Sequence, residues 1–73
     1  MQRFGEKLRL LRRRDRLTQS ELAERLGVVH SHIAGMERGK TAPSVEILLK
    51  LTKYFHVSAD VLIHDELELD DAG

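Results

Sequence analysis

The sequence has no cysteine, a single proline and few aromatic residues. Without cysteine, neither a disulfide framework nor a thiolate metal site can stabilise the fold. No apolar run approaches the length of about 18 residues that a membrane-spanning helix needs, and the N-terminus lacks the apolar segment of a secretion signal. We therefore expect one small domain in the cytoplasm, with no membrane partner.

Net charge is also lacking, since 12 Lys and Arg side chains balance 12 Asp and Glu side chains. The balance hides an asymmetry: residues 1–41 contain ten basic and five acidic side chains, whereas residues 42–73 contain two and seven. A basic half and an acidic half on one small domain suggest one face that binds a polyanion and one that faces away from it. The alternative is that the charges only solvate helix faces.

Apolar residues recur at helical spacing in several segments, and capping residues mark where some of them begin. The pattern predicts helices over residues 3–14, 19–26, 29–38, 45–55 and 59–63. Thr18 and Glu21 are placed to form a capping box, and Gly27 is suited to end the second helix in a left-handed conformation. Since no useful apolar–polar alternation precedes residue 66, the expected fold class is all-α.

Residues 66–70 do alternate, and could form a short strand, a helix extension or a frayed acidic tail. Disorder is the favoured interpretation, because terminal residues are seldom tied down. We therefore expect a domain over residues 1–64, followed by an acidic tail over residues 65–73 that is disordered or takes part in a dimer contact.

The second and third helices are separated only by a short turn that contains glycine. Helices joined in this way cross steeply, as in a helix-turn-helix unit. Such a unit needs a small residue beneath the crossing, which is Ala23, and positive φ at the turn, which Gly27 tolerates. It also needs apolar residues that hold the two helices together, namely Leu22, Leu26, Val28, Ile33 and Met36.

Residues 17–28, with the later segments 33–44 and 48–51, resemble the lambda-repressor-like family of bacterial and phage regulators. The resemblance covers residues 4–63 and implies a compact five-helix domain whose third helix enters the major groove of DNA. It implies base contacts at His30, Ser31 and Gly35, and phosphate contacts at Gln19, His32 and Arg38. It also pairs Glu37 with Arg12, in keeping with the need of a buried charge for a partner.

Further DNA contacts are expected on the third helix and in the loop that follows it. Ala34 lies on the same outward side as His30, where it suits a thymine methyl group. Lys40 and Thr41, in the loop after the third helix, are further candidates for phosphate contacts, and Arg12 could touch a phosphate as well. This set has few of the Arg, Gln or Asn side chains that recognise bases through paired hydrogen bonds. We therefore expect modest direct readout, supplemented by phosphate contacts and DNA shape.

Three positions depart from the family pattern. Val29 stands where a Ser or Thr usually caps the third helix, and its side chain cannot accept the amide hydrogen bond. Ser31 could cap a shorter helix instead, which would weaken the assignment of His30 to base contact. Gly35 weakens the middle of the helix, or lets the backbone sit close to DNA. Arg16 replaces the glycine commonly found after the first helix.

A single recognition helix contacts only a few base pairs, so we expect a homodimer on a palindromic operator with half-sites about 34 Å apart. The apolar residues near the C-terminus are the expected dimer contact: Val61, Leu62, Ile63 and Leu67. The alternative is a monomer in which Leu62 folds back onto Phe55 and Val57.

No cofactor or metal site is expected. His30 and His32 point apart on a helix, and His56 and His64 have no partner at ligand spacing. No arrangement typical of catalysis is present, so we do not expect an enzyme. Three classes remain: a DNA-binding transcriptional regulator, a repressor more often than an activator; an antitoxin that binds its own operator and a partner toxin; and an interaction module that no longer binds DNA. The first is favoured, which would place the protein with the nucleoid.

Overall fold

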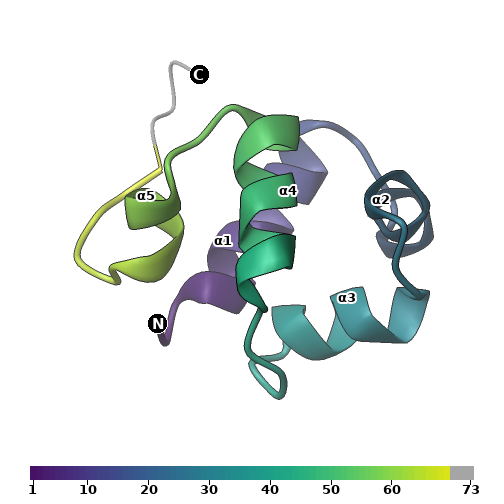
Figure 1. Ribbon diagram of the computed structural model, residues 1–73, viewed down its shortest axis with the longest axis horizontal. Coiled ribbons are helices and arrows are strands. Elements are labelled where there is room, and N and C mark those ends of the chain that lie inside the picture. Colours follow the sequence, from purple (N-terminus) through teal and green to yellow (C-terminus); the bar gives the residue numbers. More distant parts are fainter. Residues whose placement is uncertain (70–73) are drawn as a thin grey trace.

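The computed structural model describes residues 1–69, which form five α-helices and no strand. The helices are α1 (Phe4–Arg14), α2 (Gln19–Leu26), α3 (His30–Glu37), α4 (Val45–Phe55) and α5 (Ala59–Ile63). The expected all-α, five-helix fold is confirmed. In Figure 1, α4 lies in front of α1, with α2 and α3 at one end of the molecule and α5 at the other. Residues 70–73 of the expected acidic tail lie outside the described residues.

Local capping explains where three of the helices begin. The Thr18 hydroxyl accepts a hydrogen bond from the Glu21 amide at 3.0 Å, and the Glu21 carboxylate accepts one from the Thr18 amide at 2.8 Å, which completes the expected capping box. The hydroxyl groups of Ser44 and Ser58 cap α4 and α5 by accepting a hydrogen bond from the amides of Ile47 and Val61, without a capping box. No helix within residues 1–69 combines the length and the apolar character that crossing a membrane requires.

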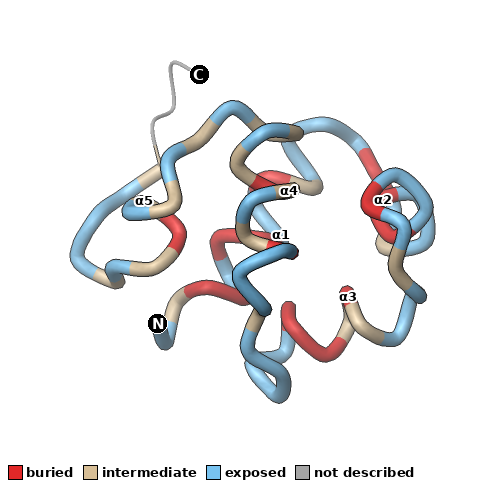
Figure 2. Tube along the Cα trace, viewed as in Figure 1, coloured by how far each residue is buried: buried red, intermediate tan, exposed pale blue. Residues whose placement is uncertain are grey.

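The core draws side chains from all five helices (Figure 2). Its largest fully buried apolar members are Leu8, Leu11, Leu22, Ile33, Met36, Leu51 and Leu62. Gly5 allows α1 and α3 to come close, because a Cβ atom at this position would lie 2.5 Å from the backbone carbonyls of Met36 and Glu37. This role of Gly5 was not predicted from the sequence, although a glycine inside a helical pattern often has a packing reason.

The turn after α1 has an unusual backbone. Arg16 has φ of 58°, in the left-handed region where side chains other than glycine are strained. Glycine, which the family resemblance implied at this position, adopts such a conformation without strain, whereas Arg16 does not.

Lys7 is completely buried, and its ammonium joins α1 to the C-terminal segment. Nζ donates to the carbonyls of Val61 at 2.6 Å, His64 at 2.8 Å and Leu67 at 2.6 Å. Carbonyls at the C-terminal end of a helix have no helical partners and carry partial negative charge, so a cation there is stabilising. The lysine thereby satisfies the end of α5.

The segment that follows α5 caps the start of α1. The Asp65 carboxylate accepts hydrogen bonds from the amides of Arg3 at 2.8 Å and Gln2 at 2.9 Å, and these bonds lower the pKa of Asp65. Arg3 also pairs with Glu68 at 2.8 Å. Residues 65–67 therefore form a turn, and the segment up to residue 69 lies against the N-terminal end of α1 and is neither a strand nor an extension of α5.

Candidate nucleic-acid interface

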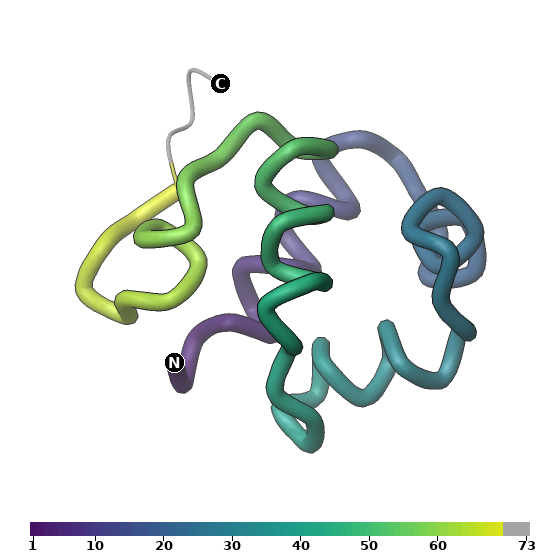
Figure 3. The backbone as a smooth tube through the Cα atoms, viewed as in Figure 1, coloured from purple at the N-terminus to yellow at the C-terminus, as the bar shows by residue number. Residues whose placement is uncertain are grey.

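The steep crossing of α2 and α3 comes from the short turn between them. Gly27 ends α2 with φ of 73°, and the Val28 amide then donates to the Ala23 carbonyl at 2.9 Å. In Figure 3, α2 is seen nearly end-on while α3 runs across the view, so the two helices lie at a large angle. Ala23 is buried, as a small residue beneath the crossing has to be. This is the geometry of a helix-turn-helix unit.

A chain of polar contacts links three helices behind α3. Arg12 on α1 donates to the Glu37 carboxylate through Nε at 2.6 Å and through Nη2 at 3.0 Å. Gln19, the first residue of α2, donates from Nε2 to Glu37 Oε1 at 3.1 Å. The other end of the same amide, Gln19 Oε1, lies 3.0 Å from His30 Nε2 at the start of α3. The contacts thus join Glu37, at the C-terminal end of α3, to His30, at the N-terminal end of the same helix, through Gln19 of α2.

Glu37 carries the charge at the centre of this chain, and its side chain has no exposed surface. Burial alone would raise the pKa of Glu37. The hydrogen bonds from Arg12 and Gln19, with the charges of Arg12 and Arg9, outweigh burial and hold the pKa below its usual range. Glu37 is therefore an anion at neutral pH, and Arg12 is the partner that the family resemblance implied.

The first turn of α3 is the part of the helix most open to solvent. His30 and Ser31 are exposed, and His32 and Ala34 are half-buried. Val29 precedes the helix with 67% of its surface exposed, and makes no side-chain cap. Because α3 begins at His30, Ser31 does not serve as a late cap.

Gly35 lies differently from the outward position expected for it. It is buried, and its carbonyl accepts hydrogen bonds from the amides of Lys40 at 2.9 Å and Thr41 at 3.4 Å. A Cβ atom on Gly35 would lie 3.0 Å from the Thr41 hydroxyl oxygen, so the loop after α3 folds over this glycine. The small residue at position 35 makes room for the protein's own loop.

The expected phosphate-contacting residues surround the exposed turn of α3 at both ends of the helix-turn-helix unit. Arg38, Lys40 and Thr41 are exposed at the C-terminal end of α3. Gln19 is half-buried, and its amide is already engaged by Glu37 and His30. Arg12 has only 12% of its side chain exposed, and Nη1 also donates to the Leu17 carbonyl at 2.8 Å. Arg12 and Gln19 therefore hold α3 in place through hydrogen bonds to residues of that helix.

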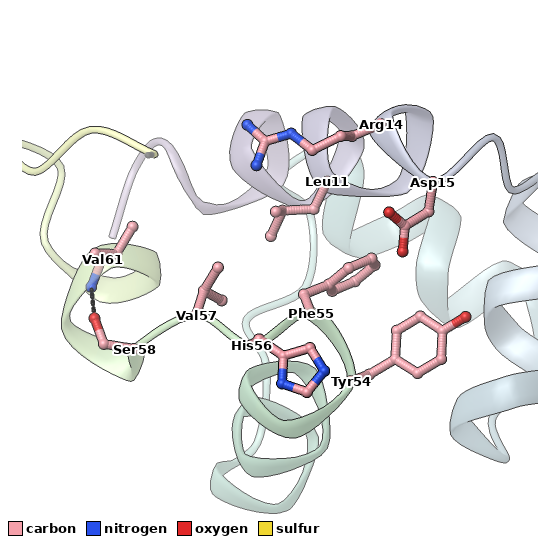
Figure 4. Close-up of a pocket in the computed structure, with 9 residues that line it drawn as sticks. All are labelled: Leu11, Arg14, Asp15, Tyr54, Phe55, His56, Val57, Ser58 and Val61. Carbon is pink, nitrogen blue, oxygen red and sulfur yellow. Dashed lines mark hydrogen bonds between the residues drawn. The ribbon is translucent and has the colours of Figure 1, made fainter. Parts of the chain in front are cut away.

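At the other end of the molecule, α5 exposes only part of the apolar surface expected for a dimer contact. Leu62 is completely buried, as the alternative fold-back predicted, so its side chain does not lie on the surface. Val61 and Ile63 are half-buried, and Leu67 is 40% exposed. Val61 borders a pocket of about 390 Å³ between α1, α4 and α5 (Figure 4). None of the residues that line this pocket belongs to α2 or α3.

In the part of the chain that the structure describes, no three His, Cys, Asp or Glu side chains gather where they could hold a metal ion.

The chain matches the model of the helix-turn-helix family over residues 8–62. It is 43% identical over 63 residues to the HTH-type transcriptional activator BcrR of Enterococcus faecalis, an alignment that covers 86% of this chain and 31% of that protein. It is 38% identical over 63 residues to an uncharacterized HTH-type transcriptional regulator of Methanocaldococcus jannaschii, covering 85% of this chain and 96% of that protein.

Solved structures give the same result. The P22 c2 repressor, crystallised in complex with a synthetic operator, is similar with a TM-score of 0.80 and 33% identity, covering 86% of this chain and 96% of that one. The chain thus spans nearly all of the archaeal relative but about a third of BcrR. These relatives are named as regulators, an activator and a repressor, and do not favour the antitoxin alternative.

Proposed function

The chain belongs to the lambda-repressor-like helix-turn-helix family, and from this premise we propose that it is a transcriptional regulator that binds a specific double-stranded DNA sequence by inserting α3 into the major groove. The observation that carries the proposal is the exposed first turn of α3, held by the Arg12–Glu37–Gln19 contacts. A recognition helix meets base edges with its N-terminal residues, and those are the residues of α3 that lie open.

In this proposal His30, Ser31 and Ala34 contact bases. His30 and Ser31 supply the polar groups, and Ala34 supplies a methyl group for a thymine. Gly35, also expected at a base, is left out of the proposed contacts, because it is buried under the loop after α3. The duplex is recognised with few side-chain hydrogen bonds to bases.

Phosphate contacts hold the duplex in place. Arg38, Lys40 and Thr41 contact the backbone on one side of the groove, and His32 and the backbone amides at the start of α2 contact it on the other. Gln19 marks the start of α2, whose unpaired amides favour an anion. Arg12 acts chiefly by holding Glu37. Most of the affinity therefore comes from phosphates and depends steeply on salt.

We further propose that two copies bind a palindromic operator as a homodimer, through α5 and the turn that follows it. The support is the position of α5 at the end of the molecule away from α2 and α3, with Val61, Ile63 and Leu67 partly exposed there (Figure 1). A dimer that covers an operator blocks access to it without further machinery, so repression is the mode proposed. With DNA as its partner, the protein would lie with the nucleoid in the cytoplasm.

Fluorescence anisotropy with labelled random duplexes tests the proposal. The logarithm of the binding constant should fall with the logarithm of salt concentration, with a slope of about −0.9 for each phosphate contacted. Lys40→Ala should reduce that slope by about 1, whatever the duplex sequence. Lys53→Ala removes the same charge from the exposed side of α4 and should leave the slope unchanged. Binding that ignores salt, or an equal effect of the two variants, would refute the proposed face.

Sedimentation of the isolated chain at micromolar concentration tests the homodimer. The mass of two chains is the expected result. The Leu67→Lys variant should sediment with the mass of one chain, and its helical content should equal that of the wild type. A monomer in the absence and in the presence of a palindromic duplex would contradict the dimer.

A further inference from the structure

The hydrogen bonds around Gln19 have a direction, and that direction decides which nitrogen of His30 carries a proton. Glu37 is a buried carboxylate held as an anion, so both of its oxygen atoms can only accept hydrogen bonds. The amide group of Gln19 must therefore turn its NH₂ toward Glu37, as the 3.1 Å contact from Nε2 to Oε1 has it. The opposite orientation would place an amide oxygen against a carboxylate oxygen.

With its NH₂ group engaged, Gln19 has only Oε1 left for His30. An amide oxygen accepts and does not donate, so the nitrogen 3.0 Å away, Nε2 of His30, must carry the hydrogen. A neutral imidazole has one N–H, and its other nitrogen is then a bare acceptor. Neutral His30 is therefore the Nε2–H tautomer with Nδ1 unprotonated.

Nδ1 remains available to a partner outside the protein. His30 is exposed at the first position of α3, and among residues 1–69 no hydrogen bond to Nδ1 is present. The charged groups linked to His30 through Gln19 are Glu37 on α3 and, in contact with Glu37, Arg9 and Arg12 on α1.

We propose that the Arg12–Glu37 pair, acting through Gln19, fixes neutral His30 as a hydrogen-bond acceptor toward DNA, so that His30 selects a base with an exocyclic amino group. This inference rests on the proposed function, and names what the first turn of α3 recognises. In the major groove only adenine and cytosine offer an amino donor, through N6 and N4. Guanine and thymine present acceptors where His30 would place its own. Gln19 is here a positioning residue, and His30 makes the contact.

Nitrogen NMR of the free protein tests the fixed tautomer without DNA. At neutral pH, the two ring nitrogens of His30 should show separate shifts typical of a protonated nitrogen at Nε2 and a bare nitrogen at Nδ1. In Gln19→Met, which keeps the side-chain length but removes the acceptor, both shifts should move toward the average of two tautomers. His32 has no such partner and serves as the internal control. Identical His30 shifts in the wild type and in Gln19→Met would overturn the proposal.

Binding to defined duplexes tests the base. The base pair that His30 contacts is identified as the one at which the His30→Ala variant binds all four bases with equal affinity. At about pH 8, adenine or cytosine there should bind about 5-fold to 150-fold more tightly than guanine or thymine, the range for one mismatched pair. Purine in place of adenine, which lacks the amino group, should lose that advantage, and His32→Ala should keep it.

The two measurements separate the possible failures. A fixed tautomer in a protein that binds no duplex would refute the proposed function and leave the hydrogen-bond chain standing. DNA binding with guanine or thymine preferred at neutral pH, or with a preference that is unchanged in Gln19→Met, would refute the role of His30 and leave the proposed function standing.

Discussion

Gly5→Ala is the substitution for which local propensity and tertiary structure predict opposite results. Alanine is the better helix former, by up to about 1 kcal/mol inside a helix, so propensity alone predicts a more stable protein. The structure predicts the reverse. The new Cβ atom would lie 2.5 Å from the backbone carbonyls of Met36 and Glu37, and neither backbone atom can rotate away as a side chain can. Relief requires α1 and α3 to separate.

Overpacking a core costs about 1–3 kcal/mol, and a clash with two backbone atoms belongs at the upper end. Against a stability near the low end of about 5–15 kcal/mol for a chain this short, a loss of about 3 kcal/mol is large. It corresponds to a melting temperature lowered by about 12–24 °C at about 4–8 °C per kcal/mol. Urea and thermal unfolding followed by circular dichroism measure both quantities.

Gly35→Ala is the matched control, because the same methyl group is added to another helical glycine. Its Cβ atom would approach only the exposed Thr41 side chain, at 3.0 Å from the hydroxyl oxygen, and that side chain can rotate. We expect this variant to be unchanged or up to about 1 kcal/mol more stable. A Gly5→Ala variant as stable as the wild type would refute the close approach of α1 to α3.

Four further predictions follow from single contacts. Arg12→Met leaves the Glu37 carboxylate buried without its main partner and should lower the unfolding free energy by about 3 kcal/mol at neutral pH. Because the folded-state pKa of Glu37 is lowered, the wild-type advantage is present above the usual carboxyl pKa and fades as pH falls through the lowered one; urea titrations that show a constant difference would contradict this. Arg16→Gly relieves the positive φ at this turn and should raise thermal stability by about 0.5–1 kcal/mol, whereas no gain would mean that the turn is unstrained. Val29→Thr supplies the missing cap of α3 and should add about 1 kcal/mol in urea unfolding, unless water already satisfies those amides. Lys7→Met leaves three buried carbonyls without their hydrogen-bond donor. Amide hydrogen exchange at Leu67, whose N–H bonds to the His64 carbonyl, should therefore quicken more than exchange in α2.

The sequence is most informative where a local signal and the fold agree. Thr18, Glu21 and Gly27 specify the two ends of α2 through short-range chemistry, so their roles follow from residue types alone. The helix-turn-helix unit follows for the same reason, since a short turn and a small residue at position 23 leave few ways to pack two helices.

Contacts between distant segments were harder to predict. Lys7 in a helical pattern is expected on the surface, and nothing near it in sequence indicates that three carbonyls from residues 61–67 surround its ammonium. Asp65 caps α1 across the whole length of the chain, so a search for caps beside each helix misses it. The family resemblance also implied a base contact at Gly35, and it took no account of the loop that folds over this glycine.

In the candidate site, the individual residues could be predicted from the sequence, but their arrangement could not. Residue types and family resemblance indicated His30, Gln19, Arg12 and Glu37 one by one. That these four form a single directed chain of hydrogen bonds depends on side-chain positions from three helices, which the sequence does not contain.

Selection of bound duplexes from a random pool tests the central claim most directly, because it reports sequence, symmetry and spacing together. The account predicts enrichment of a palindrome whose half-sites lie about 10 base pairs apart, one turn of DNA. In His30→Ala the same palindrome should return with its preference lost at one position in each half-site. A wild-type pool that shows no enrichment over its input would contradict the claim that α3 recognises DNA.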